Sequence, residues 1–505
     1  MEEHSLLFYM LKLIGSLSLF IYGMKIMSES LQKVAGNNLR SVLGAMTTNR
    51  FTGVLTGAFV TAAIQSSTAT TVMIVSFVNA GVMTLAQAIS VIMGANIGTT
   101  LTAWIMSAGF GSFNIMNLVF PAFFVAILLV YSKRRKSLGE FIFGVAFMFF
   151  GLGTLRQTGI DMQLGENPAV LSFFSSFNPN SFLTTLLFLL LGGVLTMAVQ
   201  SSAAVMAITM ILCSSGALPI YQGIALVMGE NIGTTITSNI AAMTANTQAR
   251  RAALAHMFFN IFGVVWVLCI FHPFVNMVCG FVGVNPAHID AAKLPLVLAA
   301  FHTTFNLCNT FILIWFIPQI ERLVTWVIKA PKDQAGDDEE FRLRFISGGL
   351  MSTSELSILQ AWKEISEFGK RVHRMFDMVQ KLYETTDEQD FVKLYSRIEK
   401  YENISDRLEV EIGGYLNNVS DGRLSDRSKR QIHSMLRIVS ELESVGDGNF
   451  NLARLLKHRF DGKVQFTPYM DDNVKMMFSL VENSIFLMTQ TLGADGTTHP
   501  EYLDQ

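Results

Sequence analysis

Two polar motifs that could bind ions each occur twice within apolar sequence. The triplet Gln65–Ser67 recurs as Gln200–Ser202, and the octet Met93–Thr100 recurs as Met228–Thr235 with one difference, at its third position. The two offsets are identical, because 200 − 65 and 228 − 93 both give 135. A repeated unit that places amides, hydroxyls and glycines in membrane-like sequence is a common way to build a small-ion site in secondary transporters.

The side chains of these motifs suit both an anion and a cation. A Gln amide and a Ser hydroxyl can each donate and accept hydrogen bonds, and backbone amides at a helix start attract anions without Lys or Arg. In the octet, the two glycines are expected to weaken the helix and to free carbonyl oxygens beside the oxygens of Asn and Thr. Ligands that are all oxygen suit a hard cation such as sodium.

The segments around the motifs carry almost no charge. No Asp, Glu, Lys or Arg occurs between Phe51 and Met106, and only Glu230 occurs between Phe182 and Met243. An anion that enters so neutral an interior is costly unless cations accompany it. The charge distribution therefore favours coupling of an anion to sodium.

Three other polar features allow more than one interpretation. Glu230 could take part in coupling, or could only hold a neighbouring helix or a protonatable hydrogen bond. His256 with Asn260 and His302 with Asn306 have the i, i+4 spacing of one helix face. This spacing favours interhelical hydrogen bonding over a proton relay.

The composition predicts an all-α polytopic membrane protein with a polar C-terminal region. Of 505 residues, 51% are hydrophobic and 15% are charged, and most of the charged residues follow Glu321. A crossing helix needs about 20 apolar residues. The predicted crossings are 6–24, 85–106, 115–131, 138–155, 220–243, 252–271 and 294–317. Each triplet instead lies between two shorter apolar halves, 51–64 with 68–79 and 182–199 with 203–213, which predicts a re-entrant hairpin.

Seven crossings and two hairpins give the two repeats opposite orientations in the membrane. Lys25, Arg50, the basic run at 133–136 and Arg250 then fall on the same side as the C-terminal region. The positive-inside rule places that side in the cytoplasm. The N-terminus is accordingly expected outside.

Because both motifs occur in both copies, the sequence resembles the sodium–phosphate cotransporter family, which includes the animal type II transporters, over roughly residues 5 to 320. The resemblance implies two inverted repeats whose hairpin tips meet near the midplane and bind inorganic phosphate and sodium. The phosphate ligands that it implies are Gln65, Ser66, Ser67, Gln200, Ser201 and Ser202. The sodium ligands that it implies are Gln65, Ser66, Thr68, Asn96, Thr99, Thr100, Gln200, Ser201, Asn231, Thr234 and Thr235, with Glu230 as a candidate for coupling. The animal proteins commonly have a third serine where this sequence has Thr68 and Ala203, which leaves the number of ligands at the second site open. Stretches after the first octet also differ from the family, which leaves the sodium stoichiometry and electrogenicity open.

The C-terminal part is predicted to form an antiparallel bundle of four helices. The predicted helices are 352–384, 388–416, 425–459 and 471–492, and Ser352 and Ser425 are expected to cap the first and the third. Two acidic pairs with i, i+4 spacing, Glu402 with Asp406 and Glu443 with Asp447, could share a divalent or transition metal. Solvated helix faces are the commoner explanation of such pairs.

The segment Glu441–Asn451 resembles the PhoU family of phosphate-signalling proteins, whose acidic motifs bind metal clusters. One bundle is about half of a typical PhoU chain. The resemblance therefore allows a homodimer formed through the bundle, and it also allows a bundle that has lost its metal.

These observations predict a transmembrane domain at 1–328 with repeats at about 5–131 and 138–317. A polar linker at 329–345, a PhoU-like bundle at 346–495 and a tail at 496–505 follow. The sequence shows no nucleotide-binding loop, activated nucleophile or zinc spacing, so neither an enzyme nor a nucleic-acid partner is expected. The expected function is sodium-coupled phosphate transport across the lipid bilayer of a bacterial inner membrane by alternating access. A phosphate receptor without net transport and a sodium-independent anion channel stay open as alternatives.

Overall fold

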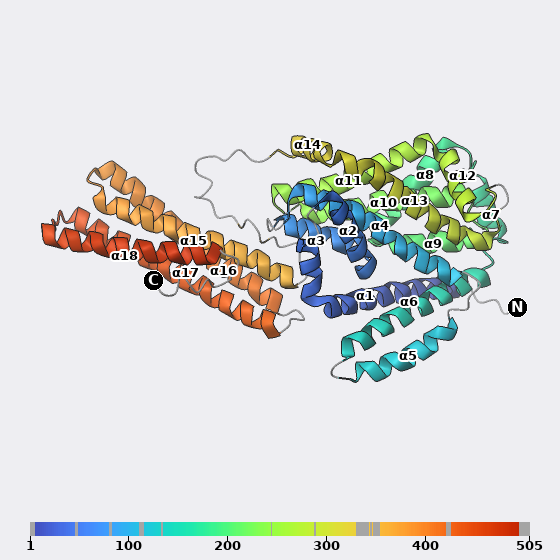
Figure 1. Ribbon diagram of the computed structural model, residues 1–505, viewed down its shortest axis with the longest axis horizontal. Helices are drawn as coiled ribbons and strands as arrows, with labels where there is room; N and C mark the ends of the chain where they lie inside the picture. Colours follow the sequence, from blue (N-terminus) through green and yellow to red (C-terminus); the bar gives the residue numbers. More distant parts are fainter. Residues whose placement is uncertain are drawn as a thin grey trace. The chain divides into compact units, whose positions relative to one another are not determined.

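The computed structural model describes residues 6–45, 49–79, 83–110, 116–132, 135–243, 245–286, 289–329, 343, 346, 354–420 and 426–493. Within them every regular element is a helix, which confirms the all-α prediction (Figure 1). The chain divides into two compact units, one with Met1–Met243 and Thr247–Lys329 and the other with Thr244–Asn246 and Ala330–Gln505. The predicted tail, nearly all of the predicted linker, the basic residues 133–134 and the predicted caps Ser352 and Ser425 lie outside the described residues.

The first unit contains fourteen α-helices and two short 3-10 helices in its described residues. They are α1 (Leu6–Ala45), α2 (Arg50–Ile64), α3 (Ser67–Asn79), α4 (Leu85–Phe110), α5 (Met116–Val130), α6 (Lys136–Asp161), α7 (Pro168–Ser175), α8 (Phe182–Val199), α9 (Ser202–Ser214), α10 (Ile220–Ala242), α11 (Thr247–Cys269), α12 (Phe271–Val282), η1 (Ala291–Lys293), α13 (Leu294–Leu313), η2 (Ile314–Phe316) and α14 (Ile317–Val327).

Six segments of the described chain are long and apolar enough to cross a membrane, which confirms a polytopic protein. Five of them coincide with predicted crossings, namely Leu7–Leu31, Leu85–Gly109, Lys136–Asp161, Thr247–Cys269 and Ala291–Val327. The sixth is Phe182–Val199, which the sequence predicted to be half of a hairpin. The predicted crossing at 115–131 is a helix of only 15 residues, and the one at 220–243 is a helix of 23 residues that contains Glu230 and several amides.

The first two residues of each polar triplet connect two helices and the third begins the second helix, in agreement with the position of the triplet between apolar halves. α2 ends at Ile64 and α3 begins at Ser67, while α8 ends at Val199 and α9 begins at Ser202. The two helices of each pair contact one another, and α2 packs along α4 as α8 packs along α10. The helix break at each triplet is thus confirmed, whereas the re-entrant course and the inverted relation of the repeats stay predictions.

The octet glycines let helix backbones approach closely. A Cβ added to Gly94 of α4 would overlap the carbonyl oxygen of Val54 on α2, and one added to Gly229 of α10 would overlap that of Leu189 on α8. Both helices continue without a break through the octet. The prediction that these glycines free carbonyl oxygens is therefore wrong, because the glycines serve packing instead.

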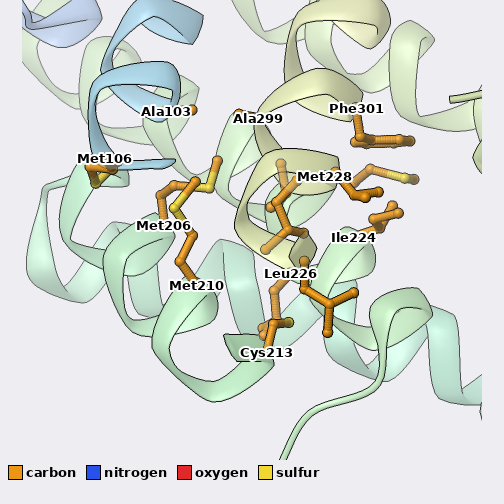
Figure 2. Close-up of a cluster of buried hydrophobic side chains, with 14 of the residues drawn as sticks. Ala103, Met106, Met206, Met210, Cys213, Ile224, Leu226, Met228, Ala299 and Phe301 are labelled. Carbon is orange, nitrogen blue, oxygen red and sulfur yellow. The ribbon is translucent and has the colours of Figure 1, made fainter. Parts of the chain in front are cut away.

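A large apolar cluster joins helices from both copies of the repeat. It includes Met106 of α4, Met206 of α9, Met228 of α10 and Phe301 of α13. Figure 2 shows Met206 and Met210 on one side of this cluster, beside Met106. Close packing of these side chains fixes the triplets relative to one another.

The second unit is a four-helix bundle in its described part, with helix bounds close to those predicted. The helices are α15 (Ser354–Glu384), α16 (Glu388–Ser420), α17 (Asp426–Asp461) and α18 (Pro468–Gly493). α15 packs against the other three helices, and two buried apolar clusters lie between the helices. Short connections make consecutive helices antiparallel, as Figure 1 shows.

Candidate functional site

Both triplets line one cavity of about 260 Å³ in the first unit. All six triplet residues contribute to its wall, so residues 135 positions apart meet at one place. The cavity is also lined by Ile21, Met24, Lys25, Ser28, Glu29, Thr68, Ala69, Thr99, Thr102, Ala103, Met106, Ala203, Met206, Glu230 and His302. Its apolar wall includes Met106 and Met206 of the cluster in Figure 2. The volume has room for several water-sized groups.

A left-handed residue turns the chain at each triplet. Gln65 has φ 57° and Gln200 has φ 56°, a conformation that costs roughly 1–2 kcal/mol for a residue with a Cβ. In each case the backbone amide of the glutamine still donates to the carbonyl of the residue four positions earlier, at 2.7 Å to Thr61 and 2.8 Å to Thr196. The same backbone geometry at both places directs the following serines toward the cavity.

The serine that follows each glutamine caps the next helix. The hydroxyl of Ser66 accepts a hydrogen bond from the amide of Ala69, and that of Ser201 accepts one from Ala204, each at 3.2 Å. Serine is a favoured residue at this capping position because it satisfies an amide that has no partner within the helix. The starts of α3 and α9, where the helix dipoles are positive, therefore lie at the cavity.

The two glutamine side chains are held differently. Oε1 of Gln65 accepts from the hydroxyl of Thr102 at 2.9 Å, and its Nε2 donates to the carbonyl of Ala62 at 2.5 Å. Gln200 is exposed, and its side chain has no hydrogen-bond partner among the described residues. The side-chain amide of Gln200, unlike that of Gln65, is therefore available to a ligand in the cavity.

Of the predicted ligands in the two octets, only Thr99 lines the cavity. The hydroxyls of Thr100, Thr234 and Thr235 donate to backbone carbonyls of their own helices, at 2.8, 2.8 and 2.7 Å. Asn96 and Asn231 are buried and lie behind the wall. The structure thus brings the triplets, Thr68, Thr99 and Glu230 together and leaves the other octet residues outside the cavity.

Two buried amides of the octets form equivalent contacts with histidines. Oδ1 of Asn96 lies 3.4 Å from Nε2 of His256, and Oδ1 of Asn231 lies 3.1 Å from Nε2 of His302. The first pair joins α4 to α11, and the second joins α10 to α13. The predicted interhelical hydrogen bonds are therefore confirmed for the two histidines, whereas the amides of Asn260 and Asn306 donate to the carbonyls of His256 and His302 in their own helices.

The sequence did not identify the contribution of α1 to this cavity. Lys25, Ser28 and Glu29 line it, although the predicted crossing ends at residue 24. Nζ of Lys25 lies 3.9 Å from Oε1 of Glu29, and both side chains are at least half exposed. The cavity therefore has charged groups on α1 in addition to Glu230, and the charge of this pair is balanced within itself.

Comparisons with known proteins identify the first unit. A profile described as Na+/Pi-cotransporter matches residues 19–157 and 174–283, which include both triplets and both octets. The chain belongs to the Na+/Pi-cotransporter family. Members of this family are transport proteins, so the chain is a transport protein rather than an enzyme.

Relatives of this Na+/Pi-cotransporter family member occur in bacteria and animals. The chain is 24% identical over 443 residues to YjbB of Escherichia coli strain K12, which is named as a proposed inorganic phosphate export protein, and the match covers 87% of this chain and 76% of YjbB. It is 29% identical over 315 residues to YqeW of Bacillus subtilis, covering 62% and 95%. It is 34% identical over 139 residues to the human sodium-dependent phosphate transport protein 2B, covering 26% and 20%. No solved structure matches the chain.

The bundle of this Na+/Pi-cotransporter family member carries a PhoU domain, since a PhoU profile matches residues 365–456. Glu402, Asp406 and Asp447 each place a carboxylate oxygen within 4.8 Å of the others, whereas Glu443 is outside this group. Burial, and after it the charges of Asp406 and Asp447, raise the pKa of Glu402. Burial and the charge of Asp447 likewise raise the pKa of Asp406. Metal binding by these carboxylates stays a prediction.

Proposed function

We propose that this protein transports inorganic phosphate together with sodium across the inner membrane of a bacterium by alternating access. The observation that carries the proposal is the single cavity lined by both triplets, with the starts of α3 and α9 at its wall. Helix starts and serine hydroxyls can bind a phosphate anion, and the same hydroxyls and amide oxygens can bind sodium.

The charge of the cavity supports coupling to sodium. Lys25 is the one Lys or Arg in its wall, and its charge is balanced by Glu29. A phosphate dianion that leaves water for this site needs countercharge that the wall does not supply. Cotransported sodium ions provide that charge, and the name of the human relative agrees with this coupling.

The bundle is proposed to be cytoplasmic and to adjust transport to the phosphate supply. Its PhoU domain supports a regulatory role, and the positive-inside rule supports its location. In this arrangement the N-terminus is outside. The six triplet residues bind phosphate, and Thr68 and Thr99 join them in sodium binding. The remaining octet residues shape the site from behind.

Uptake of radioactive phosphate into proteoliposomes tests the proposal. A sodium gradient of either direction should drive phosphate in the direction of sodium flow, whereas a potassium gradient should not. Phosphate flux that persists without sodium would favour a channel, and no flux under any gradient would favour a receptor. Either result would contradict the proposed function.

Two glutamine variants make the test specific to the site. Gln200→Ala should abolish coupled uptake while the protein stays folded, because the amide of Gln200 is free for the ligand. Gln157→Ala is a matched control, since the amide of Gln157 donates to Asp161 at 2.8 Å and does not line the cavity. Unchanged uptake by Gln200→Ala would contradict the assigned site.

A further inference from the structure

Glu230 is a buried carboxylate whose two oxygens have no hydrogen-bond partner among the described residues. The residue is 1% exposed, and neither Oε1 nor Oε2 meets a donor. It nevertheless belongs to the wall of the cavity. An ionised carboxylate in such surroundings is strongly disfavoured unless a positive charge reaches it.

The helices packed around Glu230 do not supply that positive charge. α10 packs against α3, α8, α9, α11 and α13. α3 and α8 carry no ionisable side chain, and α9 carries only the thiol of Cys213. On α11, Nε of Arg251 donates to the carbonyl of Ile328 at 2.9 Å, and Arg250 is exposed.

The remaining ionisable groups near the cavity either contact other residues or are thiols, which cannot supply a positive charge. His256 of α11 contacts Asn96, Cys269 of α11 is exposed and Cys308 of α13 is half-buried. Lys25 on α1 is 68% exposed and faces Glu29. No Lys or Arg of the described chain therefore pairs with Glu230.

The wall of the same cavity also offers neutral ligands. Gln200, Ser201, Ser202 and Thr99 supply oxygen atoms to the same wall, and His302 lines it as well. Nε2 of His302 contacts Asn231, while its Nδ1 has no partner among the described atoms. One carboxylate among neutral oxygens matches a hard cation of single charge, since a divalent ion would need further anionic ligands.

We propose that Glu230 is the anionic ligand of one sodium ion in the cavity, and that this ion balances the charge of the protein rather than that of phosphate. The inference rests on the sodium coupling proposed above and assigns one of the sodium ions to a residue. The first copy of the octet has Ala95 at the equivalent position. The carboxylate therefore comes from the second copy alone, and the site should fill in the absence of phosphate.

Binding of radioactive sodium to the purified full chain in detergent, without phosphate, tests the inference. At saturation Glu230→Gln should bind one sodium ion fewer per chain than the wild type. Glu166→Gln is the matched control, because Glu166 is exposed and does not line the cavity. It should retain the wild-type sodium count.

Thermal unfolding gives a readout that a packing role of Glu230 would not produce. Sodium chloride should raise the melting temperature of the wild type above its value in choline chloride, because a ligand that binds only the folded state stabilises it. Without sodium, Glu230→Gln should melt above the wild type, since the uncompensated charge is gone. This variant should show a smaller response to sodium.

An unchanged sodium count in Glu230→Gln would overturn the inference, and so would a wild type that melts equally in sodium and choline. If the Gln variant does not fold, Glu230→Asp replaces it. The shorter side chain withdraws the carboxylate, so sodium affinity should fall about tenfold, which is the effect of about 1.4 kcal/mol, and unchanged affinity would overturn the inference. Because no phosphate is present, a failure of phosphate transport would leave this result intact.

Discussion

Substitution of Gly233 by alanine should force α10 away from α8, the helix that leads into the second triplet. A Cβ at Gly233 of α10 would lie 2.6 Å from the carbonyl oxygen of Gly193 and 2.7 Å from the Cβ of Thr196, both on α8. Ordinary contact begins at 3.4 Å, so the shorter distance falls 0.8 Å short. Neither atom can move by a rotamer change, because one is backbone and the other is a Cβ.

The expected cost of this overlap is about 1–3 kcal/mol of folding free energy, as for other overpacked interiors. The displacement acts directly on the functional site, because the carbonyl of Thr196 accepts a hydrogen bond from the backbone amide of Gln200 at 2.8 Å. If the strain destabilises the phosphate-bound state relative to the empty state by about 1.4 kcal/mol, the phosphate concentration for half-maximal uptake rises about tenfold.

Two measurements check the Gly233→Ala variant. Reversible unfolding in mixed micelles gives the free-energy change, and sodium-driven phosphate uptake in proteoliposomes gives the functional change. Gly280→Ala on α12 is the control, since a Cβ there would meet nothing within 4 Å, and it should match or slightly exceed wild-type stability. A Gly233→Ala protein with wild-type unfolding and wild-type uptake would refute the packing argument.

Three further perturbations test separate parts of the molecule. Asn231→Leu leaves Nε2 of His302 without its acceptor and should lower the free energy of unfolding by about 1–3 kcal/mol. The double variant with His302→Leu should lose less unfolding free energy than the sum of the two single changes. Gln200→Asn tolerates the left-handed backbone but shortens the amide by one methylene, so we expect a folded protein whose phosphate uptake is weaker, and normal uptake would argue against direct contact. In the bundle, the raised pKa of Glu402 and Asp406 means that the folded state retains protons that the unfolded state has lost. The stabilising contribution of these groups is therefore complete below about pH 4 and decreases as the pH rises through their folded pKa values. Asp406→Asn should flatten this pH dependence in melting experiments without metal and should weaken any stabilisation by manganese or zinc, and an unaltered pH profile would contradict the predicted repulsion.

The sequence predicted the parts of the fold that local patterns determine. The helix breaks at Gln65 and Gln200 follow from polar residues between two apolar halves, and the bundle helices follow from periodicity. The end of α1 was missed because the apolar run stops near Met24, whereas helical hydrogen bonding continues to Ala45. A helix can leave apolar surroundings without ending, so hydropathy alone does not locate its terminus.

The missed parts of the site depend on contacts between distant segments. A glycine pair inside a helix can weaken it or admit a neighbouring backbone, and only the position of α8 against α10 shows that Gly229 does the latter. The hydrogen bond from Thr102 to Gln65 and the presence of Glu29 at the cavity likewise depend on the relative rotation of helices. Spacing along the chain does not specify that rotation.

The unequal anchoring of the two glutamines has a consequence for how cargo preference can change. The oxygen and the nitrogen of the Gln65 side-chain amide are both hydrogen-bonded within the protein. The first loop therefore forms a fixed wall against which any oxyanion must fit. The loop at Gln200 retains freedom to adapt. Variants selected to discriminate a larger oxyanion from phosphate should therefore accumulate at 200–203 rather than at 65–68, even though the two loops have nearly the same sequence.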